Sequence, residues 1–240
     1  MDRRSFLRTS AIGGAAAATT TLAAPVYAQG NRELTMVTSV PDGFAVFDDA
    51  AQLFIDYVTE MTDGSISFNK QPAGSLVGAF EVFDAVSAGQ ADVYHSADYY
   101  FLNQHPGFAF FTSVPFGMTA QEMANWYYRR GGQELHDNLS GLFNIKPLMC
   151  GMTAMQPGGW FNTEITSAQD LQGLRFRMPG QGGQVLGRLG ASVQNIPGGE
   201  IYQALSSGQI DGAEWIGPYT DERMGIQEVT NTYYAAGFHE

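Results

Sequence analysis

Apolar positions in the first hundred residues follow two periods in turn, and this alternation predicts strands that lead into helices. From 44 to 61 they recur every three or four residues, as on one face of a helix. A second helical pattern, at 79–88, stops at Gly89, a residue that favours the left-handed end of a helix. Strand patterns occur at 34–38, 65–69 and 91–95. The alternation predicts an α/β fold with a mostly parallel sheet covered by helices.

Part of this pattern occurs twice. Residues 81–92 (EVFDAVSAGQAD) and residues 200–211 (EIYQALSSGQID) are identical at six of twelve positions. Each copy is typical of a helix, a glycine stop and an immediate strand, so we expect two similar α/β lobes. Phe83 and Tyr202 occupy equivalent positions in the repeat, and we expect both in hydrophobic cores.

The repeat and the crossovers predict the domain organisation. We expect a first crossover near 150–153, with lobe I at 29–152, lobe II at 153–237 and a return crossover that begins at 238–240. Two lobes joined in this way leave a ligand cleft between the carboxyl ends of their sheets, the hinge-closing design of periplasmic binding proteins of type II-like fold.

The first 28 residues have the pattern of an export signal. Arg3 and Arg4 precede a mildly apolar stretch at 11–24, and small residues stand before a cleavage point at Gln29. The arginine pair favours the twin-arginine route over an ordinary secretory signal. After the signal, the sequence has no run of apolar residues that is long enough to span a bilayer. We therefore expect a periplasmic protein.

Charge and cysteine content narrow the class further. Without residues 1–28, nine basic residues remain against 23 acidic ones, a balance that disfavours nucleic acid and anionic membranes as partners. Cys150 is the single cysteine and lies in an apolar run that suggests a buried strand. We therefore expect a core cysteine rather than a nucleophile.

Familiar catalytic and metal-binding motifs are missing from the sequence. It has no Gly-x-Ser-x-Gly elbow, no phosphate-binding Gly-x-x-x-x-Gly-Lys-Ser/Thr loop and no His-Glu-x-x-His pair, and its four histidines lack zinc-site spacing. The run at 179–183 (PGQGG) could bind an anion through backbone N–H groups, but a glycine-rich turn is the simpler interpretation. Nothing in the sequence argues for an enzyme.

Two arginines carry the first candidate chemistry. Arg175 and Arg177 lie in an alternating strand pattern, so both side chains share one face, opposite Leu174 and Phe176. A guanidinium matches a carboxylate in two-point geometry, which suits an organic acid. A solvated edge of the sheet is the alternative.

Glu214 and Trp215 are the second candidates, because they follow the second copy of the repeat at the carboxyl edge of a strand. Glu214 could bind a hard cation, or it could pair with an arginine. Trp160 and Tyr100 are further candidates, since aromatic walls with few polar groups suit small organic ligands.

These segments resemble a known family. The runs at 170–177 (DLQGLRFR) and 204–215 (ALSSGQIDGAEW) look like the signature segments of TRAP-transporter periplasmic solute-binding proteins, the DctP-like family. Four segments look closest to its 2-oxo acid (α-keto acid) receptors, and they are 98–101 (DYYF), 155–161 (MQPGGWF), 214–219 (EWIGPY) and 237–240 (GFHE).

The resemblance implies a role for each matching residue. Arg177 matches the arginine that pairs with the substrate carboxylate, and Tyr100 matches a residue that hydrogen-bonds the ligand. A bound cation, usually sodium, bridges substrate and protein in that subgroup. Its ligands match the Gln156 side chain, Glu214, the Trp215 backbone oxygen and Glu240. Arg175 stands where the family often has lysine, and we expect a supporting or surface base there.

The resemblance also implies a longer protein. Family members continue past position 240, return to lobe I and end in long helices that mediate dimers, so we expect this chain to lack its C-terminal part.

The residues and the resemblance suggest three alternative functions. The first is an extracytoplasmic receptor that binds a 2-oxo monocarboxylate such as pyruvate with sodium and delivers it to membrane-embedded TRAP subunits. The second is a receptor for lactate or another monocarboxylate with calcium. The third, for which twin-arginine export is the usual argument, is a periplasmic enzyme.

Overall fold

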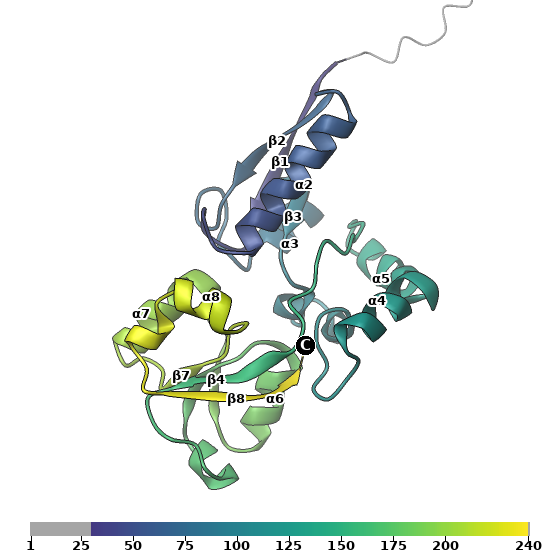
Figure 1. The fold of residues 1–240 in the computed structure, drawn as a ribbon. Coiled ribbons are helices and arrows are strands. Elements are labelled where there is room, and N and C mark those ends of the chain that lie inside the picture. The colour runs from purple at the N-terminus through teal and green to yellow at the C-terminus, as the bar shows by residue number, and fades with distance from the viewer. Residues whose placement is uncertain (1–29, 240) are drawn as a thin grey trace, which may run out of the picture.

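The computed structural model describes residues 30–239, which form two separate sheets with their helices (Figure 1). The signal at 1–28 and the cation ligand Glu240 predicted from the sequence lie outside these residues. Of the described helices, none is both long enough and apolar enough to cross a membrane.

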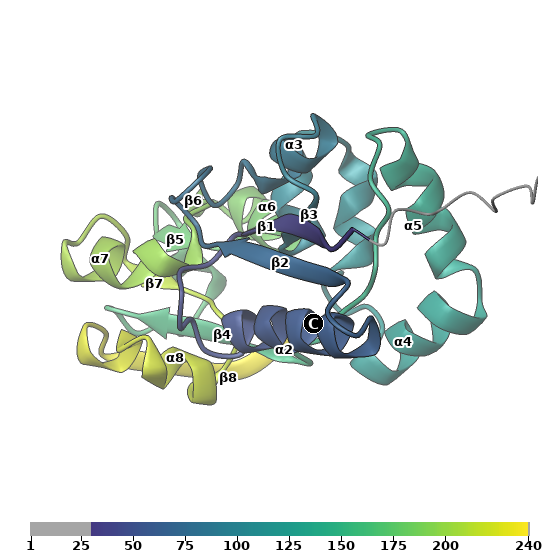
Figure 2. The same cartoon turned by 90° about the horizontal axis from the view of Figure 1, so that it is seen from above.

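The first sheet is entirely parallel, as the sequence predicts. Its strands β1 (Arg32–Thr38), β2 (Ile66–Gln71) and β3 (Val93–His95) are ordered β2-β1-β3. Helix α2 (Phe47–Met61) covers one face and helix α3 (Val82–Ser87) the other, as seen from above in Figure 2. The apolar stripe of α2 packs through Ala51 and Ile55 against Met36 of β1.

Helix α2 begins three residues later than the hydrophobic period predicts. Val46 has a φ of 71°, outside the helical region, so the chain cannot be helical before it. Asp49 accepts a hydrogen bond from the Val46 backbone N–H at 3.0 Å and closes the first turn. Phe44 therefore lies in the loop that precedes the helix, at the edge of the sheet where β1 ends.

The second sheet is mixed. It consists of β4 (Gln156–Phe161), β5 (Arg175–Arg177), β6 (Ser192–Gln194), β7 (Gly212–Ala213) and β8 (Thr232–His239), in the order β6-β5-β7-β4-β8. Strands β5, β6 and β7 run parallel, whereas β4 is antiparallel to β7 and β8. Helix α6 (Gly180–Arg188) covers the face that contains Phe176, and helix α7 (Ile201–Ser206) covers the face that contains Ala213.

The repeated segments form the same joint in both sheets, which confirms the repeat. Each helix ends at a glycine with positive φ, 74° at Gly89 and 69° at Gly208, before the chain enters β3 or β7. The shared aspartate then accepts the backbone N–H of the neighbouring strand. Asp92 accepts from Thr35 at 2.8 Å, and Asp211 accepts from Arg175 at 2.9 Å.

The segment between the sheets contains helices that the hydrophobic pattern did not reveal. They are the 3₁₀ helices η1 (Asp98–Phe101) and η2 (Pro106–Phe111) and the α-helices α4 (Ala120–Arg129) and α5 (Gly132–Gly141). Aromatic residues of this segment, among them Phe101 and Phe108, join the core of the first sheet around Phe83. The remaining short elements are η3 (Ala168–Leu171), η4 (Gly198–Glu200), α8 (Pro218–Arg223) and η5 (Ile226–Glu228).

Two burial predictions are wrong. Cys150 is exposed and lies in an extended connection from α5 to β4, where no strand pairs with it among the described residues. Tyr202 is 39% exposed although its equivalent Phe83 is buried. The reason is tertiary: Phe101, Phe108 and Phe143 cover Phe83, whereas the Tyr202 ring lies against Gly225.

Hereafter lobe I and lobe II denote the parts of the chain around the first and second sheets. Their boundaries, 29–152 and 153–237, stay predictions.

Candidate functional site

The two arginines of β5 have opposite environments. Phe176 between them points into the core of lobe II, so both arginines project from the other face, as strand alternation predicts. The Arg177 residue, at the carboxyl end of the strand, has no solvent exposure at all. A guanidinium is buried completely only where hydrogen-bond acceptors surround it, because an unpaired buried charge is strongly unfavourable.

Four hydrogen bonds hold the Arg177 guanidinium. Nε donates to the Ile196 carbonyl oxygen at 3.0 Å. Nη1 donates to the Glu214 carbonyl oxygen at 2.8 Å and to the Glu214 carboxylate at 3.1 Å. Nη2 donates to the phenolic oxygen of Tyr100 at 3.1 Å. The Tyr100 contact joins residues 77 positions apart and links lobe I to lobe II.

The electrostatics of the site keep Arg177 charged. Burial by itself lowers the pKa of the Arg177 guanidinium. The facing oxygens of Tyr100 and Glu214 act in the opposite direction, and the pKa ends above its ordinary value. Burial also raises the pKa of the neighbouring Tyr99 phenol well above its usual range. The site is therefore a buried positive group held by the oxygens of Tyr100 and Glu214.

Arg175 does not reach this site. Its side chain is 44% exposed and forms an ion pair with Asp211, and Nη1 donates to the Gly208 carbonyl oxygen at 2.7 Å. The hydrogen bonds from Arg175 lower the pKa of the Asp211 carboxyl. Arg175 thus holds the repeated joint of lobe II against β5. These contacts fit the supporting role that was predicted for it.

Trp215 forms the wall between the lobes. The Arg177 guanidinium carbon lies 4.9 Å from the centroid of the Trp215 ring, within cation–π range. Phe44 and Phe47 of lobe I approach the same indole with centroid separations of 5.5 and 5.7 Å. Aromatic side chains of both lobes therefore meet next to Arg177.

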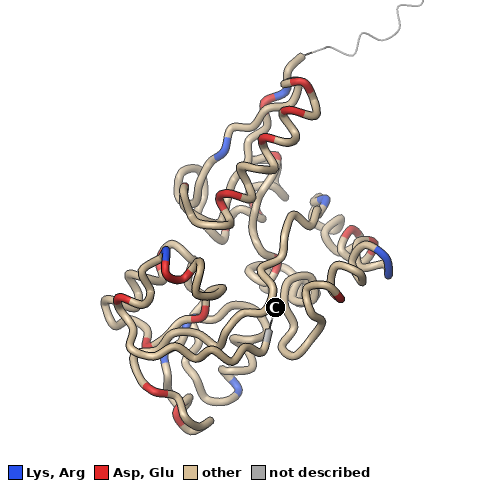
Figure 3. The backbone as a smooth tube through the Cα atoms, viewed as in Figure 1, with Lys and Arg blue, Asp and Glu red and all other residues tan. Residues whose placement is uncertain are grey.

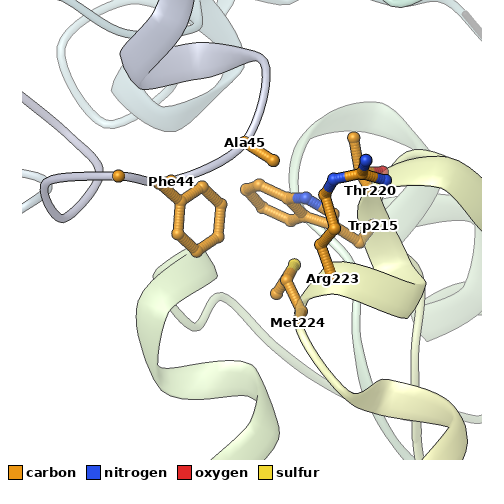
Figure 4. A pocket seen from close by; sticks show the side chains of 7 residues that line it. Phe44, Ala45, Trp215, Thr220, Arg223 and Met224 are labelled. Carbon is orange, nitrogen blue, oxygen red and sulfur yellow. The ribbon is translucent and has the colours of Figure 1, made fainter.

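A cavity of about 350 Å³ opens beside this aromatic contact. Figure 4 shows Phe44 and Ala45 of lobe I on one side, with Arg223 and Met224 of lobe II on the other. Trp215 lines the cavity, but Arg177 does not. The cavity therefore opens between the two lobes. In this arrangement Tyr100 and Glu214 cover the Arg177 side chain.

The predicted cation ligands come from neighbouring strands of lobe II. Gln156 begins β4 and is buried, and its Nε2 donates to Thr153 at 2.8 Å. Glu214 is buried and directly follows β7. The backbone pairing of Gln156 with His239 brings the end of β8 next to Gln156.

The chemistry of this donor set fits a hard cation. An amide oxygen, a carboxylate and a backbone carbonyl are the ligands that sodium and calcium accept. Within residues 30–239 no cluster of three His, Cys, Asp or Glu side chains forms a metal site. The predicted ligand set is of mixed oxygen types, and its fourth member, Glu240, lies outside the described residues.

Trp160 belongs to the packing of lobe II. Its indole N–H donates to Asp221 at 2.9 Å, and its ring lies 4.4 Å from that of Tyr233 on the neighbouring strand. Its described contacts are all within that lobe, in contrast to those of Trp215.

Several residues at the contact between the lobes were not predicted from the sequence. Phe44, Phe47 and Tyr99 all follow the carboxyl ends of β1 or β3, and this position is the signal that could have identified them. The glycine-rich run at 179–183, which opens helix α6 instead of forming a separate turn, also has a tertiary reason. Gly180 has a φ of 65°, and a Cβ there would lie 3.0 Å from Tyr99, so glycine lets the lobes approach closely.

Two α/β lobes with a buried arginine and an aromatic contact between them define a two-lobe solute-binding protein. The model of one family, the bacterial extracellular solute-binding proteins of family 7 (DctP), matches residues 36–239, and the chain belongs to this family. The predicted family and the predicted location outside the cytoplasm are confirmed. The family is one of transport receptors and not of enzymes.

Relatives with known ligands have similar sequences and structures. The monocarboxylate 2-oxoacid-binding periplasmic protein of Nostoc sp. (strain PCC 7120) is 43% identical over 245 residues, which cover the whole chain and 67% of that protein. A TRAP periplasmic solute-binding protein from Pseudoalteromonas atlantica, solved with bound sodium and pyruvate, is 38% identical with a TM-score of 0.83. Another from Colwellia psychrerythraea, solved with calcium and pyruvate, is 37% identical with a TM-score of 0.81. Both structural alignments cover 87% of this chain.

The chain is shorter than these relatives. It spans 65% of the length of each of the two crystallised proteins.

Proposed function

We propose that this protein is the extracytoplasmic, periplasmic solute receptor of a TRAP transporter and binds a small 2-oxo monocarboxylate such as pyruvate together with a cation. It makes and breaks no bond in its ligand. Its partners are the membrane-embedded TRAP subunits, and it forms a homodimer. The observation that carries the proposal is the fully buried Arg177, held at the lobe interface by groups from both lobes.

The hydrogen bonds of Arg177 support one position for the ligand carboxylate. Nε and Nη1 donate to Ile196 and Glu214 within lobe II. Nη2 donates to Tyr100 at the lobe boundary. We expect the ligand carboxylate to bind at Nη2 and the Tyr100 hydroxyl, because a phenol can donate to a carboxylate in the same plane as a guanidinium. Trp215 would flank the ligand.

The acidic surface raises the question of how an anion is bound. Acidic residues are distributed along the backbone of both lobes (Figure 3), and the Glu214 carboxylate lies 3.1 Å from the Arg177 guanidinium. A second anion beside Glu214 is unfavourable unless a positive charge offsets it. Bound sodium or calcium supplies that charge and accepts carboxylate and oxo oxygens, with Gln156, Glu214, the Trp215 carbonyl and Glu240 as its protein ligands.

Access to Arg177 requires a motion of the lobes. Tyr100 covers Nη2, while Phe44 and Phe47 cover Trp215. A ligand reaches the guanidinium when these lobe I contacts separate, and it is enclosed when they form again. This is the hinge closure by which two-lobe receptors bind.

Calorimetry of the full chain with pyruvate, in sodium chloride and in choline chloride of equal ionic strength, tests the proposal. We expect binding in sodium and weaker binding in choline. If neither salt gives heat with pyruvate or larger 2-oxo acids, the ligand class is wrong.

The variant Glu214→Gln tests the cation site. It keeps the shape of the side chain and removes the charge, so we expect pyruvate affinity in sodium to fall by about tenfold or more. The difference between sodium and choline should shrink. Glu33→Gln, at the exposed start of β1, is the matched control and should bind as the wild type does.

One specific observation favours a second candidate, a receptor that uses calcium. The Colwellia relative was solved with calcium and pyruvate, and the same oxygen ligands accept either ion. Metal analysis of the purified protein, followed by competition of lactate against pyruvate, separates the candidates.

A further inference from the structure

A cluster of polar side chains lies between α4, α5 and η1, the short helix that contains Tyr100. The His136 ring is buried on α5, and its Nδ1 lies 2.9 Å from the Tyr127 hydroxyl of α4. Its Nε2 lies 3.4 Å from the Asp98 carboxylate. Phe111 stacks on the imidazole with a centroid separation of 4.1 Å and an interplanar angle of 9°. The ring is thus fixed on one face and through Nδ1, while Nε2 makes no hydrogen bond among the described residues and faces the Asp98 carboxylate.

Tyr127 fixes the orientation of the His136 ring. Burial, with a contribution from the Asp98 charge, raises the pKa of Tyr127 to about 12, so the phenol keeps its proton at neutral pH. A protonated phenol can donate to Nδ1 or accept from it, and in either arrangement the Tyr127 oxygen fixes the orientation of the imidazole.

Asp98 is the first residue of the helix that carries Tyr100. Helix η1 spans only Asp98–Phe101, so a displacement of Asp98 moves Tyr100 with it. The Tyr100 hydroxyl is the lobe I group on Arg177, at 3.1 Å. The backbone N–H of Tyr99 donates to Thr112 at 3.2 Å, a second anchor on the same short element.

A packing role alone does not explain this cluster. Burying an imidazole and a phenol is unfavourable unless they satisfy each other, and the contacts of His136 with Tyr127 and Asp98 tie α5 to both α4 and η1. The arrangement specified here is that of η1 relative to α4 and α5.

We propose that His136 is a positioning residue for ligand binding, which holds Asp98 so that the Tyr100 hydroxyl stands at Arg177. His136 does not touch the ligand. The proposal rests on the proposed function, because it assumes that a carboxylate binds at Arg177 and Tyr100.

Pyruvate calorimetry in sodium tests the proposal with His136→Phe, which keeps a stacked ring and removes both nitrogens. We expect the Kd to rise about five- to tenfold, because Asp98 loses the polar group that faces it. Asp137→Asn is the control on the same helix, because Asp137 contacts Gln133 and Lys146 instead of η1. It should bind pyruvate as the wild type does.

A double-mutant cycle distinguishes positioning from a general loss of structure. In a Tyr100→Phe background, His136→Phe should change the Kd less than twofold, because the hydroxyl through which it acts is absent. An undiminished effect in that background overturns the proposal, as does a wild-type Kd for His136→Phe alone. If His136→Phe does not fold, Tyr127→Phe, which removes a single oxygen, is expected to raise the Kd two- to threefold in the same cycle.

Amide hydrogen exchange without ligand separates failure of the proposal from failure of the proposed function. Exchange in the segment 98–104 should be faster in His136→Phe than in the wild type and unchanged in Asp137→Asn. If the wild type does not bind pyruvate, the function is wrong and the exchange rates still decide whether His136 holds η1. If the exchange rates are unchanged in His136→Phe and the wild type binds pyruvate, the role of His136 is overturned and the proposed function stands.

Discussion

The repeated joints at 81–96 and 200–215 have the same backbone and different chemistry. In both, a helix ends at a left-handed glycine and an aspartate accepts the N–H of the adjacent strand. The alignment then makes His95 of lobe I equivalent to Glu214 of lobe II. His95 packs beside Phe47, whereas Glu214 pairs with Arg177.

The adjacent strand explains the difference. In lobe I the position equivalent to Arg177 is Val37, because Val37 pairs with Tyr94 as Arg177 pairs with Ala213, and the apolar Val37 side chain is buried in the core. In lobe II the strand next to Glu214 ends in Arg177. One joint therefore supplies a neutral wall and the other supplies a charged site. The joint sets where a side chain lies, and the neighbouring strand sets what it does.

The largest expected effect is that of Arg177→Ala in the charged joint. It leaves the Glu214 carboxylate buried without its cation, so we expect the free energy of unfolding to fall by about 3 kcal/mol. Pyruvate affinity should fall by about 100-fold or more, because the carboxylate loses its charged donor. Urea unfolding and calorimetry measure the two effects, and normal binding by this variant would show that the site is elsewhere.

Arg175→Ala is the matched variant on the same face of β5. Its side chain is largely in solvent, and it fastens only Asp211 and the Gly208 carbonyl. We expect a small decrease in Tm and an unchanged Kd for pyruvate.

The next effect should be equal in the two lobes. Gly89→Ala and Gly208→Ala each place a side chain at a positive φ, with no atom within 4 Å of the new Cβ. Only backbone strain remains, so we expect each to destabilise by about 1 kcal/mol in urea unfolding. Gly187→Ala, in helix α6 without a positive φ, should be neutral or stabilising. Clearly unequal values for the two joints would contradict their equivalence.

The smallest effect is the pH dependence of His95. Burial lowers the pKa of its imidazole, and Asp48 opposes this only in part. As the pH falls below about 6.5, the unfolded chain binds a proton that the folded protein resists, so stability falls. His95→Gln should reduce the difference in unfolding free energy between pH 7.5 and pH 5.5. An identical difference in variant and wild type would mean that other groups set the acid sensitivity.

Much of lobe I and the repeat could be predicted because the signals are local. The 3.6-residue period of α2, the stops at Gly89 and Gly208 and the shared face of Arg175 and Arg177 each depend on residues close in sequence. The helices between 98 and 141 were not predicted because they are short: η1 and η2 join the core of the first sheet through single buried aromatic residues, and α4 and α5 pack mainly on each other and on η2. Cys150 was misplaced for a related reason, since an apolar run becomes a buried strand only where another strand pairs with it.

The sequence by itself determined the α/β class, the two joints and the residue types of the site, because period, glycine stops and strand alternation are properties of neighbouring residues. Only the tertiary structure decided which arginine is buried and which is exposed. It also brought Tyr100 to Arg177 and His136 to Asp98. These contacts join residues tens of positions apart, and their geometry depends on how the two lobes pack.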